Sequence, residues 1–262
     1  MIQDEIKEED KFKYIETSSE NKEVLLLLHG LFGALSNFDG VIGHFREQYN
    51  VVVPILPMYE LPIREVSVTG LVNHVIDFVT YKQFDKVNVM GNSLGGHITL
   101  LFALARPELI NSIILTGSSG LFENSLGSTF PKRGSYEFIK EKTENTFYDP
   151  SVATKELTDE VYGIVNDRNK AIRVVATAKS AVRHNLGDKL HQIEAPTLLI
   201  WGKQDNVTPA FVGEKFHELI TSSRLVMVDK CGHAPMMEHP KRYNEIVETF
   251  LNELAAKKNL SS

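Results

Sequence analysis

Residues 87–105 read VNVMGNSLGGHITLLFALA, and this stretch is the strongest indication of the fold. It begins with the apolar run Val87–Met90, passes through the glycine-rich segment Gly91–Gly96 and continues with the helix-like run Ile98–Ala105. A Gly-x-Ser-x-Gly pattern between a strand and a helix places its serine on a sharp turn. Because glycine tolerates the backbone angles of such a turn, we expect Ser93 in a strained conformation, with its hydroxyl exposed above the sheet.

Outside this stretch, short apolar runs alternate with helical patterns. Six runs rich in β-branched and apolar residues predict strands: Val24–Leu28, Val51–Leu56, Val87–Met90, Ile113–Thr116, Thr197–Trp201 and Leu225–Val228. Four stretches predict helices: Val66–Tyr81, Leu94–Ala105, Pro209–Leu219 and Lys241–Ala256, with the tail after Lys257 expected to fray. Strands that alternate with helices form βαβ units, so we predict an α/β fold with a doubly wound, mostly parallel sheet.

The alternation stops between residues 120 and 190, where strand-like runs disappear. Three polar stretches there have helical patterns instead: Tyr136–Thr146, Thr158–Val165 and Lys170–Arg183. We predict one α/β core formed by residues 1–119 and 191–262, with a helical cap inserted at residues 120–190. A cap of this kind supplies an apolar pocket, and we expect Phe122 and Phe138 to contact a substrate in it.

The composition argues against several classes of partner. The 262 residues are 42% hydrophobic and carry a formal net charge of -6 from dispersed acids, so nucleic acid is not an expected partner. The single Cys231 cannot form an internal disulfide or a multi-cysteine zinc site, which favours the cytoplasm. No signal-peptide pattern or membrane-length apolar run is visible, so we expect no membrane association. The sequence predicts no oligomeric state.

A serine nucleophile needs a base, usually a histidine, and a carboxylate that orients the base. After the nucleophile, an acid and then a histidine should follow later strands. Asp205 follows the predicted strand Thr197–Trp201, and His233 follows the next one. Asp229 and Glu238 are rival acids, but they lie close to His233 in sequence, which favours Asp205.

Acyl transfer builds negative charge on a carbonyl oxygen, which two backbone N–H groups usually stabilise. One donor is expected from Leu94, directly after the nucleophile. The other is expected from the loop that follows the strand Val24–Leu28, either from Leu31 or, as second choice, from Phe32. In the same loop, His29 is expected to hold the backbone by hydrogen bonds.

Taken in order, these motifs resemble the α/β-hydrolase fold family over nearly the whole chain. Within the family, the chain is most similar to capped single-domain esterases and to hydrolases of aromatic meta-cleavage products, which share Gly-Asn-Ser-x-Gly-Gly and Ile-Trp-Gly-x-x-Asp. The resemblance to the carbon–carbon hydrolases implies that Asn92 and Asn37 line the active site. It departs from their pattern in two places. No arginine aligns without gaps to hold a dienoate carboxylate, which leaves Arg168 and Arg173 as the candidates to reach it, and Ala234 stands where these enzymes often carry a bulky aromatic residue.

From these residues we predict a serine hydrolase that cleaves a small carboxylic ester or related acyl substrate through an acyl-enzyme on Ser93. The chemistry needs no metal and no organic cofactor. Three alternatives stay open: a carbon–carbon hydrolase of meta-cleavage dienoates, an acyltransferase with an alcohol or thiol acceptor, and a non-catalytic ligand receptor on the same fold. The presence of Ser93, Asp205 and His233 together disfavours the receptor.

Overall fold

A computed structural model describes residues 5–18, 22–33, 38–124 and 134–261. Its described strands form an eight-stranded sheet in the order β1-β2-β4-β3-β5-β6-β7-β8. The strands are β1 (Lys7–Glu9), β2 (Phe12–Glu16), β3 (Val24–Leu28), β4 (Asn50–Pro54), β5 (Val87–Asn92), β6 (Ile110–Thr116), β7 (Thr197–Gly202) and β8 (Ser223–Val228). Strands β3 to β8 are parallel to one another, whereas β2 pairs antiparallel with β4 and β1 pairs antiparallel with β2. The predicted mostly parallel α/β sheet is confirmed.

The strand order reverses between β3 and β5. The chain leaves β3 toward β4 on one side and later enters β5 on the other side. In open α/β sheets, ligands bind outside the carboxyl ends of the strands at such a reversal. Leu28 pairs with Gly91 at that end of the two strands. The segments that follow β3 and β5 therefore start side by side.

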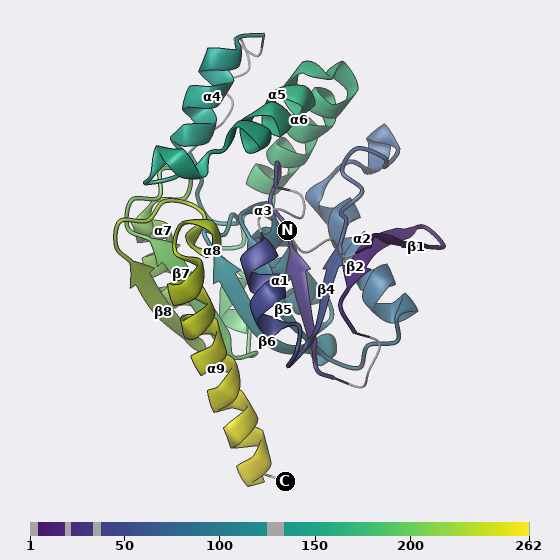
Figure 1. The fold of residues 1–262 in the computed structure, drawn as a ribbon. Helices are drawn as coiled ribbons and strands as arrows, with labels where there is room; N and C mark the ends of the chain where they lie inside the picture. The colour runs from purple at the N-terminus through teal and green to yellow at the C-terminus, as the bar shows by residue number, and fades with distance from the viewer. Residues whose placement is uncertain (1–4, 19–21, 34–37, 125–133, 262) are drawn as a thin grey trace.

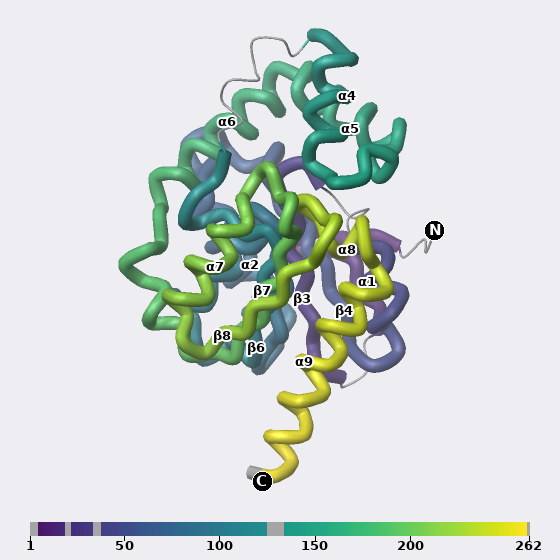
Figure 2. Tube along the Cα trace, turned by 90° about the vertical axis from the view of Figure 1, so that its left-hand side faces the viewer, coloured from purple at the N-terminus to yellow at the C-terminus, as the bar shows by residue number. Residues whose placement is uncertain are grey.

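Helices cover both faces of the sheet, as Figure 2 shows with the sheet between two helical layers. One layer contains α2 (Val68–Tyr81), α3 (Leu94–Ala105) and α7 (Ala210–Leu219), and the other contains α1 (Asp39–Phe45), α8 (Pro235–Glu238) and α9 (Pro240–Ser261). Each layer has its own apolar cluster. Alternate residues of β3 supply both clusters, because Leu26 and Leu28 face the α2 side while Leu25 and Leu27 face the α1 side.

Among the described residues between β6 and β7, three α-helices sit above the upper edge of the sheet in Figure 1: α4 (Tyr136–Glu144), α5 (Lys155–Asn166) and α6 (Arg168–Arg183). Each begins at a capping side chain. Ser135, Thr154 and Asp167 accept backbone N–H groups of the first turns of α4, α5 and α6. The segment packs on both faces of the core, since Phe147 joins the cluster on the α1 side and Leu186 joins the one on the α2 side.

The ends of the chain differ from the sequence-based expectation. No strand was predicted among the charged residues near the N-terminus, yet Phe12 and Tyr14 of β2 alternate with Lys13 and are buried. Alternation over five residues is a weak signal beside so many charges. At the other end, α9 continues to Ser261, beyond the predicted end at Ala256. An ion pair of 2.9 Å between Lys258 and Glu23 connects this last part of α9 to the core.

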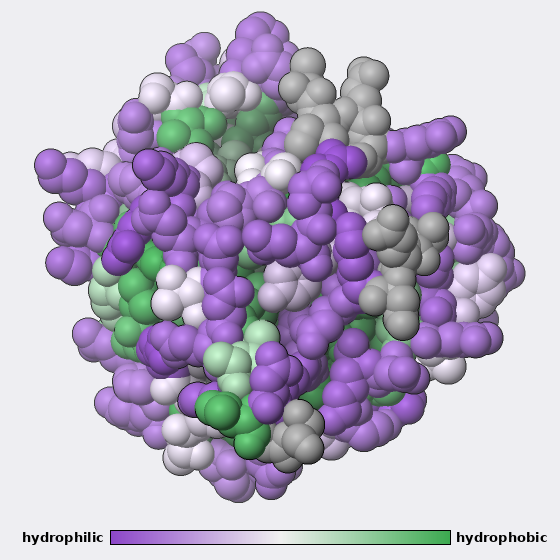
Figure 3. All heavy atoms as spheres, turned by 60° about the horizontal axis from the view of Figure 1, so that its bottom comes forward, coloured by the Kyte–Doolittle hydropathy of each residue, from purple (hydrophilic) through white to green (hydrophobic). Residues whose placement is uncertain are grey.

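The lower end of the molecule has a mostly hydrophilic surface with a few apolar patches (Figure 3). Of the helices that the structure describes, none is long and apolar enough to cross a bilayer.

Two buried histidines predict a loss of stability in acid. Burial lowers the pKa of His74 in α2 and of His97 in α3 to about 4, below the value near 6.5 expected in an unfolded chain. Between these values the unfolded state binds more protons than the native state, so stability falls as the pH falls from 6.5 toward 4. Replacing His74 by phenylalanine keeps a ring against Phe12, whose centroid is 5.1 Å away, and removes the titration.

We therefore expect His74→Phe to be at least as stable as the wild type at pH 7. At pH 4.5 its advantage should grow by about 2 kcal/mol in the free energy of unfolding. Urea unfolding at both pH values measures this difference. Equal losses of stability in the two proteins would contradict the assignment to His74.

Candidate active site

The backbone at Ser93 is strained in the way its motif predicts. Ser93 joins β5 to α3 with φ 54° and ψ -118°, a region that L-residues rarely adopt. Its N–H donates to the Thr116 carbonyl at 3.1 Å, and its own carbonyl accepts the Ser119 N–H at 3.1 Å. Strand β6 and the segment after it thus hold the turn from both sides.

The flanking glycines allow this turn because the backbone is crowded there. A Cβ at Gly95 would lie 1.9 Å from the Leu28 carbonyl oxygen, and a Cβ at Gly91 would lie 2.5 Å from the Gly95 carbonyl oxygen. Neither position can accommodate a side chain without moving the main chain. The two outer glycines of the motif therefore let α3 start directly against the end of β3.

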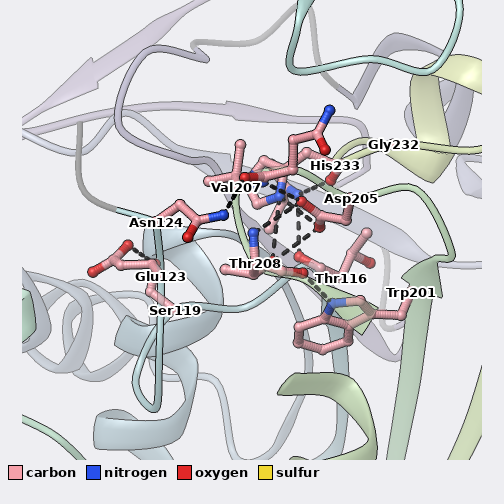
Figure 4. Close-up of polar contacts among 12 residues, drawn as sticks. Thr116, Ser119, Glu123, Asn124, Trp201, Asp205, Val207, Thr208, Gly232 and His233 are labelled. Atoms are coloured by element: carbon pink, nitrogen blue, oxygen red, sulfur yellow. Dashed lines mark hydrogen bonds and ion pairs between the residues drawn. The ribbon is translucent and has the colours of Figure 1, made fainter. Parts of the chain in front are cut away.

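A histidine and a buried carboxylate form a second part of the site. His233 Nδ1 lies 2.8 Å from Asp205 Oδ2, and both side chains are buried (Figure 4). Asp205 also accepts the backbone N–H groups of Val207 and Thr208 at 2.8 and 2.9 Å and the Thr208 hydroxyl at 2.9 Å. A carboxylate with these donors is acceptor-only when ionised, so the His233 proton belongs on Nδ1. Nε2 is then left with a free lone pair.

His233 Nε2 is buried and has no hydrogen-bond partner among the residues that the structure describes. Two further contacts hold its loop, one from the residue before Ser93 and one from the end of β6. Asn92, the residue before Ser93, donates from Nδ2 to the His233 carbonyl at 3.3 Å and to the Thr116 carbonyl at 3.1 Å. Gly117, with φ 50°, approaches so closely that a Cβ there would lie 2.8 Å from His233 Nδ1. The imidazole is therefore confined between the ends of β6 and β7.

The loop after β3 lies against Ser93. A Cβ at Gly30 would lie 3.4 Å from the Ser93 Cβ. His29 Nδ1 is 2.9 Å from the Gly30 carbonyl, and its Nε2 accepts the Leu56 N–H at 3.2 Å, so Nδ1 carries the proton. Burial lowers the pKa of His29, which keeps the ring neutral and suited to both bonds. His29 thus holds the loop as expected.

The predicted oxyanion donors lie on this loop and on α3. Leu94 is the first residue of α3, where a backbone N–H has no partner within the helix. Leu31 directly follows Gly30, is half-buried, and accepts the Tyr59 hydroxyl on its carbonyl at 3.5 Å. Phe32, the second choice, is also half-buried.

Of the four residues predicted to contact a substrate, the structure describes Asn92, Phe122 and Phe138. Asn37 lies outside the described residues. Asn92 is buried, and its amide nitrogen donates to two backbone carbonyls, as described above. Phe122 is 47% exposed and packs on Phe211 of α7, with ring centroids 5.4 Å apart. Phe138 is half-buried beneath Lys142.

The rival acids make other contacts. Asp229 is exposed and pairs with Lys203 at 3.5 Å. Glu238 accepts the Gly232 and Tyr148 N–H groups, each at 2.7 Å. Asp205 is therefore the acid that contacts His233.

Two residues near His233 belong to no recognisable sequence motif. Thr208 completes the donors around Asp205. Glu123 follows β6, is half-buried, and accepts the Ser119 hydroxyl at 2.9 Å. Burial raises the pKa of the Glu123 carboxyl, while the Ser119 hydrogen bond and His233 partly offset this rise. The only sequence signal for Glu123 is its place after the carboxyl end of a strand. Among the described residues, no three His, Cys, Asp or Glu side chains gather to hold a metal ion.

Known proteins resemble this chain along most of its length. Residues 23–240 match the family described as the alpha/beta hydrolase fold. A solved α/β-hydrolase enzyme from the metagenome of lagoon sediments at Mar Chica, Morocco, is 40% identical, with a TM-score of 0.78 over 95% of this chain and 99% of that one. A bacterial membrane phospholipase A is 26% identical, with a TM-score of 0.81 over 93% of this chain and 83% of its own.

A third similar protein, a curated relative, is named for a dienoic acid substrate. The 2-hydroxy-6-oxo-6-(2'-aminophenyl)hexa-2,4-dienoic acid hydrolase of Metapseudomonas resinovorans is 27% identical over 93% of this chain and 88% of its own length. The family match, the sheet topology and these relatives agree with the resemblance read from the motifs. The chain is a hydrolase that belongs to the α/β-hydrolase fold family.

Proposed function

We propose that Ser93 is the nucleophile of a hydrolase that cleaves a small carboxylic ester or related acyl substrate. The observation that carries this proposal is His233. Its Nδ1 donates to a buried carboxylate, while its Nε2 is buried without a partner among the described residues. An imidazole with its proton on Nδ1 and an unpartnered Nε2 can accept a proton at Nε2 as a general base. The strained Ser93 turn is held against the same loop by Asn92.

In the proposed reaction, Ser93 Oγ attacks the substrate carbonyl as its proton passes to His233 Nε2. The imidazolium that forms is stabilised by Asp205 through the 2.8 Å bond to Nδ1. His233 then gives the proton to the leaving alcohol, which leaves an acyl group on Ser93. A water molecule, deprotonated by His233, attacks this ester, and His233 returns the proton to Ser93 Oγ as the acid is released.

The negative charge on the carbonyl oxygen is assigned to the N–H groups of Leu94 and Leu31. The close approach of Gly30 to Ser93 supports this assignment, because it brings the next peptide of the loop to the nucleophile. The start of α3 adds the positive end of a helix dipole at the same point.

A second candidate is the hydrolysis of a carbon–carbon bond in a meta-cleavage dienoate, as the Metapseudomonas relative is named for such a substrate. Arg173 of α6 supports it. Its Nη2 donates to the Leu61 carbonyl at 3.5 Å, and its Nε is buried without a partner among the described residues. Tyr59, close by in the chain, reaches the Leu31 carbonyl. Arg173 is therefore better placed for a substrate carboxylate than the exposed Arg168.

The first test compares p-nitrophenyl esters of increasing acyl length with a meta-cleavage dienoate, using the wild type and Ser93→Ala. We expect Ser93→Ala to fold normally and to lose at least about three orders of magnitude in kcat, as removal of a triad nucleophile does. Preference for short esters would favour the esterase, and preference for the dienoate would favour the second candidate. A Ser93→Ala variant that keeps the wild-type rate would refute the mechanism.

The assignment of the acid is tested with Asp205→Asn. The amide can donate to His233 Nδ1, which moves the proton to Nε2 and removes the base. We expect kcat to fall by about four orders of magnitude while KM changes little. Asp229→Asn is the matched control, since Asp229 is exposed, and its kcat should stay within about twofold of the wild type. The reverse pattern would make Asp229 the acid.

Arg173→Met separates the two candidate substrates. If Arg173 binds a carboxylate, the variant should raise KM for the dienoate by about tenfold or more, because a charge-assisted bond is lost. KM for the neutral p-nitrophenyl acetate should stay within about twofold. Arg183→Met, on the exposed end of the same helix, is the control. An unchanged KM for the dienoate would remove the carboxylate site from the second candidate.

A further inference from the structure

One carboxylate outside the triad contacts two parts of the molecule at once. Glu238 is the last residue of α8, five positions after His233. Its Oε1 accepts the Gly232 N–H at 2.7 Å, next to His233 in the chain. Its Oε2 accepts the Tyr148 N–H at 2.7 Å and lies 3.4 Å from the Asp149 N–H. Each oxygen thus serves a different segment.

The segment around Tyr148 connects α4 to the rest of the helical insertion, and it also touches the site directly. The His233 N–H donates to the Thr146 carbonyl at 2.9 Å. Asn206, in the loop that carries Asp205, donates from Nδ2 to the Asn145 carbonyl at 3.3 Å. Residues 145–149, called here the connector, therefore contact the loops of both the base and the acid.

The connector packs closely against the histidine loop. A Cβ at Gly232 would lie 2.6 Å from the Thr146 carbonyl oxygen, so the two backbones are in direct contact. Phe147 of the connector is buried in the cluster on the α1 side. Hydrogen bonds from N–H groups to a carboxylate are stronger than bonds between neutral groups, so Glu238 supplies the strongest links between the connector and this loop.

We infer that Glu238 is a positioning residue, whose carboxylate fixes the His233 loop and the connector relative to each other. The orientation of the base therefore depends on how the helical insertion packs against the core. The inference rests on the proposed role of His233 as the base. Displacing a catalytic group by about 1 Å can cost on the order of a hundredfold in rate. Loss of the carboxylate should therefore lower the rate of the chemical step without abolishing the fold.

The test replaces Glu238 by glutamine, which has nearly the same shape but offers an NH2 group to one of the two N–H donors. Active sites are counted by titration with a fluorophosphonate, and kcat is expressed per titrated site. We expect kcat per site on p-nitrophenyl acetate to fall by about tenfold or more, with KM within about twofold. A purely structural role would lower the number of titrated sites and leave kcat per site unchanged.

Hydrogen exchange supplies a measurement that does not depend on turnover. In Glu238→Gln, peptides that contain Gly232 and peptides that contain Tyr148 should both exchange faster than in the wild type. Glu214→Gln replaces an exposed residue on α7 and is the control. It should change neither kcat per site nor the exchange rate of these peptides. If the glutamine variant does not fold, Glu238→Asp decides the question, since its shorter carboxylate keeps the charge but reaches only one of the two segments.

The outcomes distinguish the two levels of the proposal. A wild type that hydrolyses no ester, or hydrolyses it without Ser93, overturns the proposed function. A wild type with Ser93-dependent turnover, together with Glu238 variants whose kcat per site stays within twofold, overturns the role of Glu238. Faster exchange at only one of the two segments would also contradict a link between them.

Discussion

The contact on which the site depends is the approach of α3 to the end of β3. Gly95 lies so close to the Leu28 carbonyl that no side chain fits between them. This contact places the first turn of α3 beside the loop after β3, so a Cβ at Gly30 would lie 3.4 Å from the Ser93 Cβ. A larger residue at position 95 would separate two parts of the site that come from strands adjacent in the sheet but distant in sequence. Ser93, between the two segments, has the strained φ of 54°.

Around this point, backbone groups do most of the positioning. Asn92 and His29 are polar and buried, and each bonds main-chain atoms of a neighbouring loop or strand. Thr208, also buried, instead donates its hydroxyl and its backbone N–H to the Asp205 carboxylate. Such bonds hold the loops of the candidate site in place. Asn92, which the resemblance placed in the lining of the active site, uses its amide nitrogen for two of them.

The sequence predicted the parts of the site that are local. Ser93, Asp205 and His233 each follow a recognisable strand, and parallel strands bring their carboxyl ends to one edge. Other parts depend on contacts between distant segments, which periodicity cannot reveal. The pairing of Glu238 with Tyr148 spans ninety residues, and β2 is recognisable only once Phe12 and Tyr14 pack beneath α2. Glu123 has no motif, and its raised pKa comes from burial that only the fold creates.

The helical segment between β6 and β7 is packed into the core beneath it. Phe147 is part of the apolar cluster on one face of the sheet, and Leu186 is part of the cluster on the other. Removing residues 120–190, or exchanging them for the corresponding segment of a relative, would open both clusters at once. A change of specificity by shuffling this region between homologues therefore has to carry the buried anchor residues along with the helices.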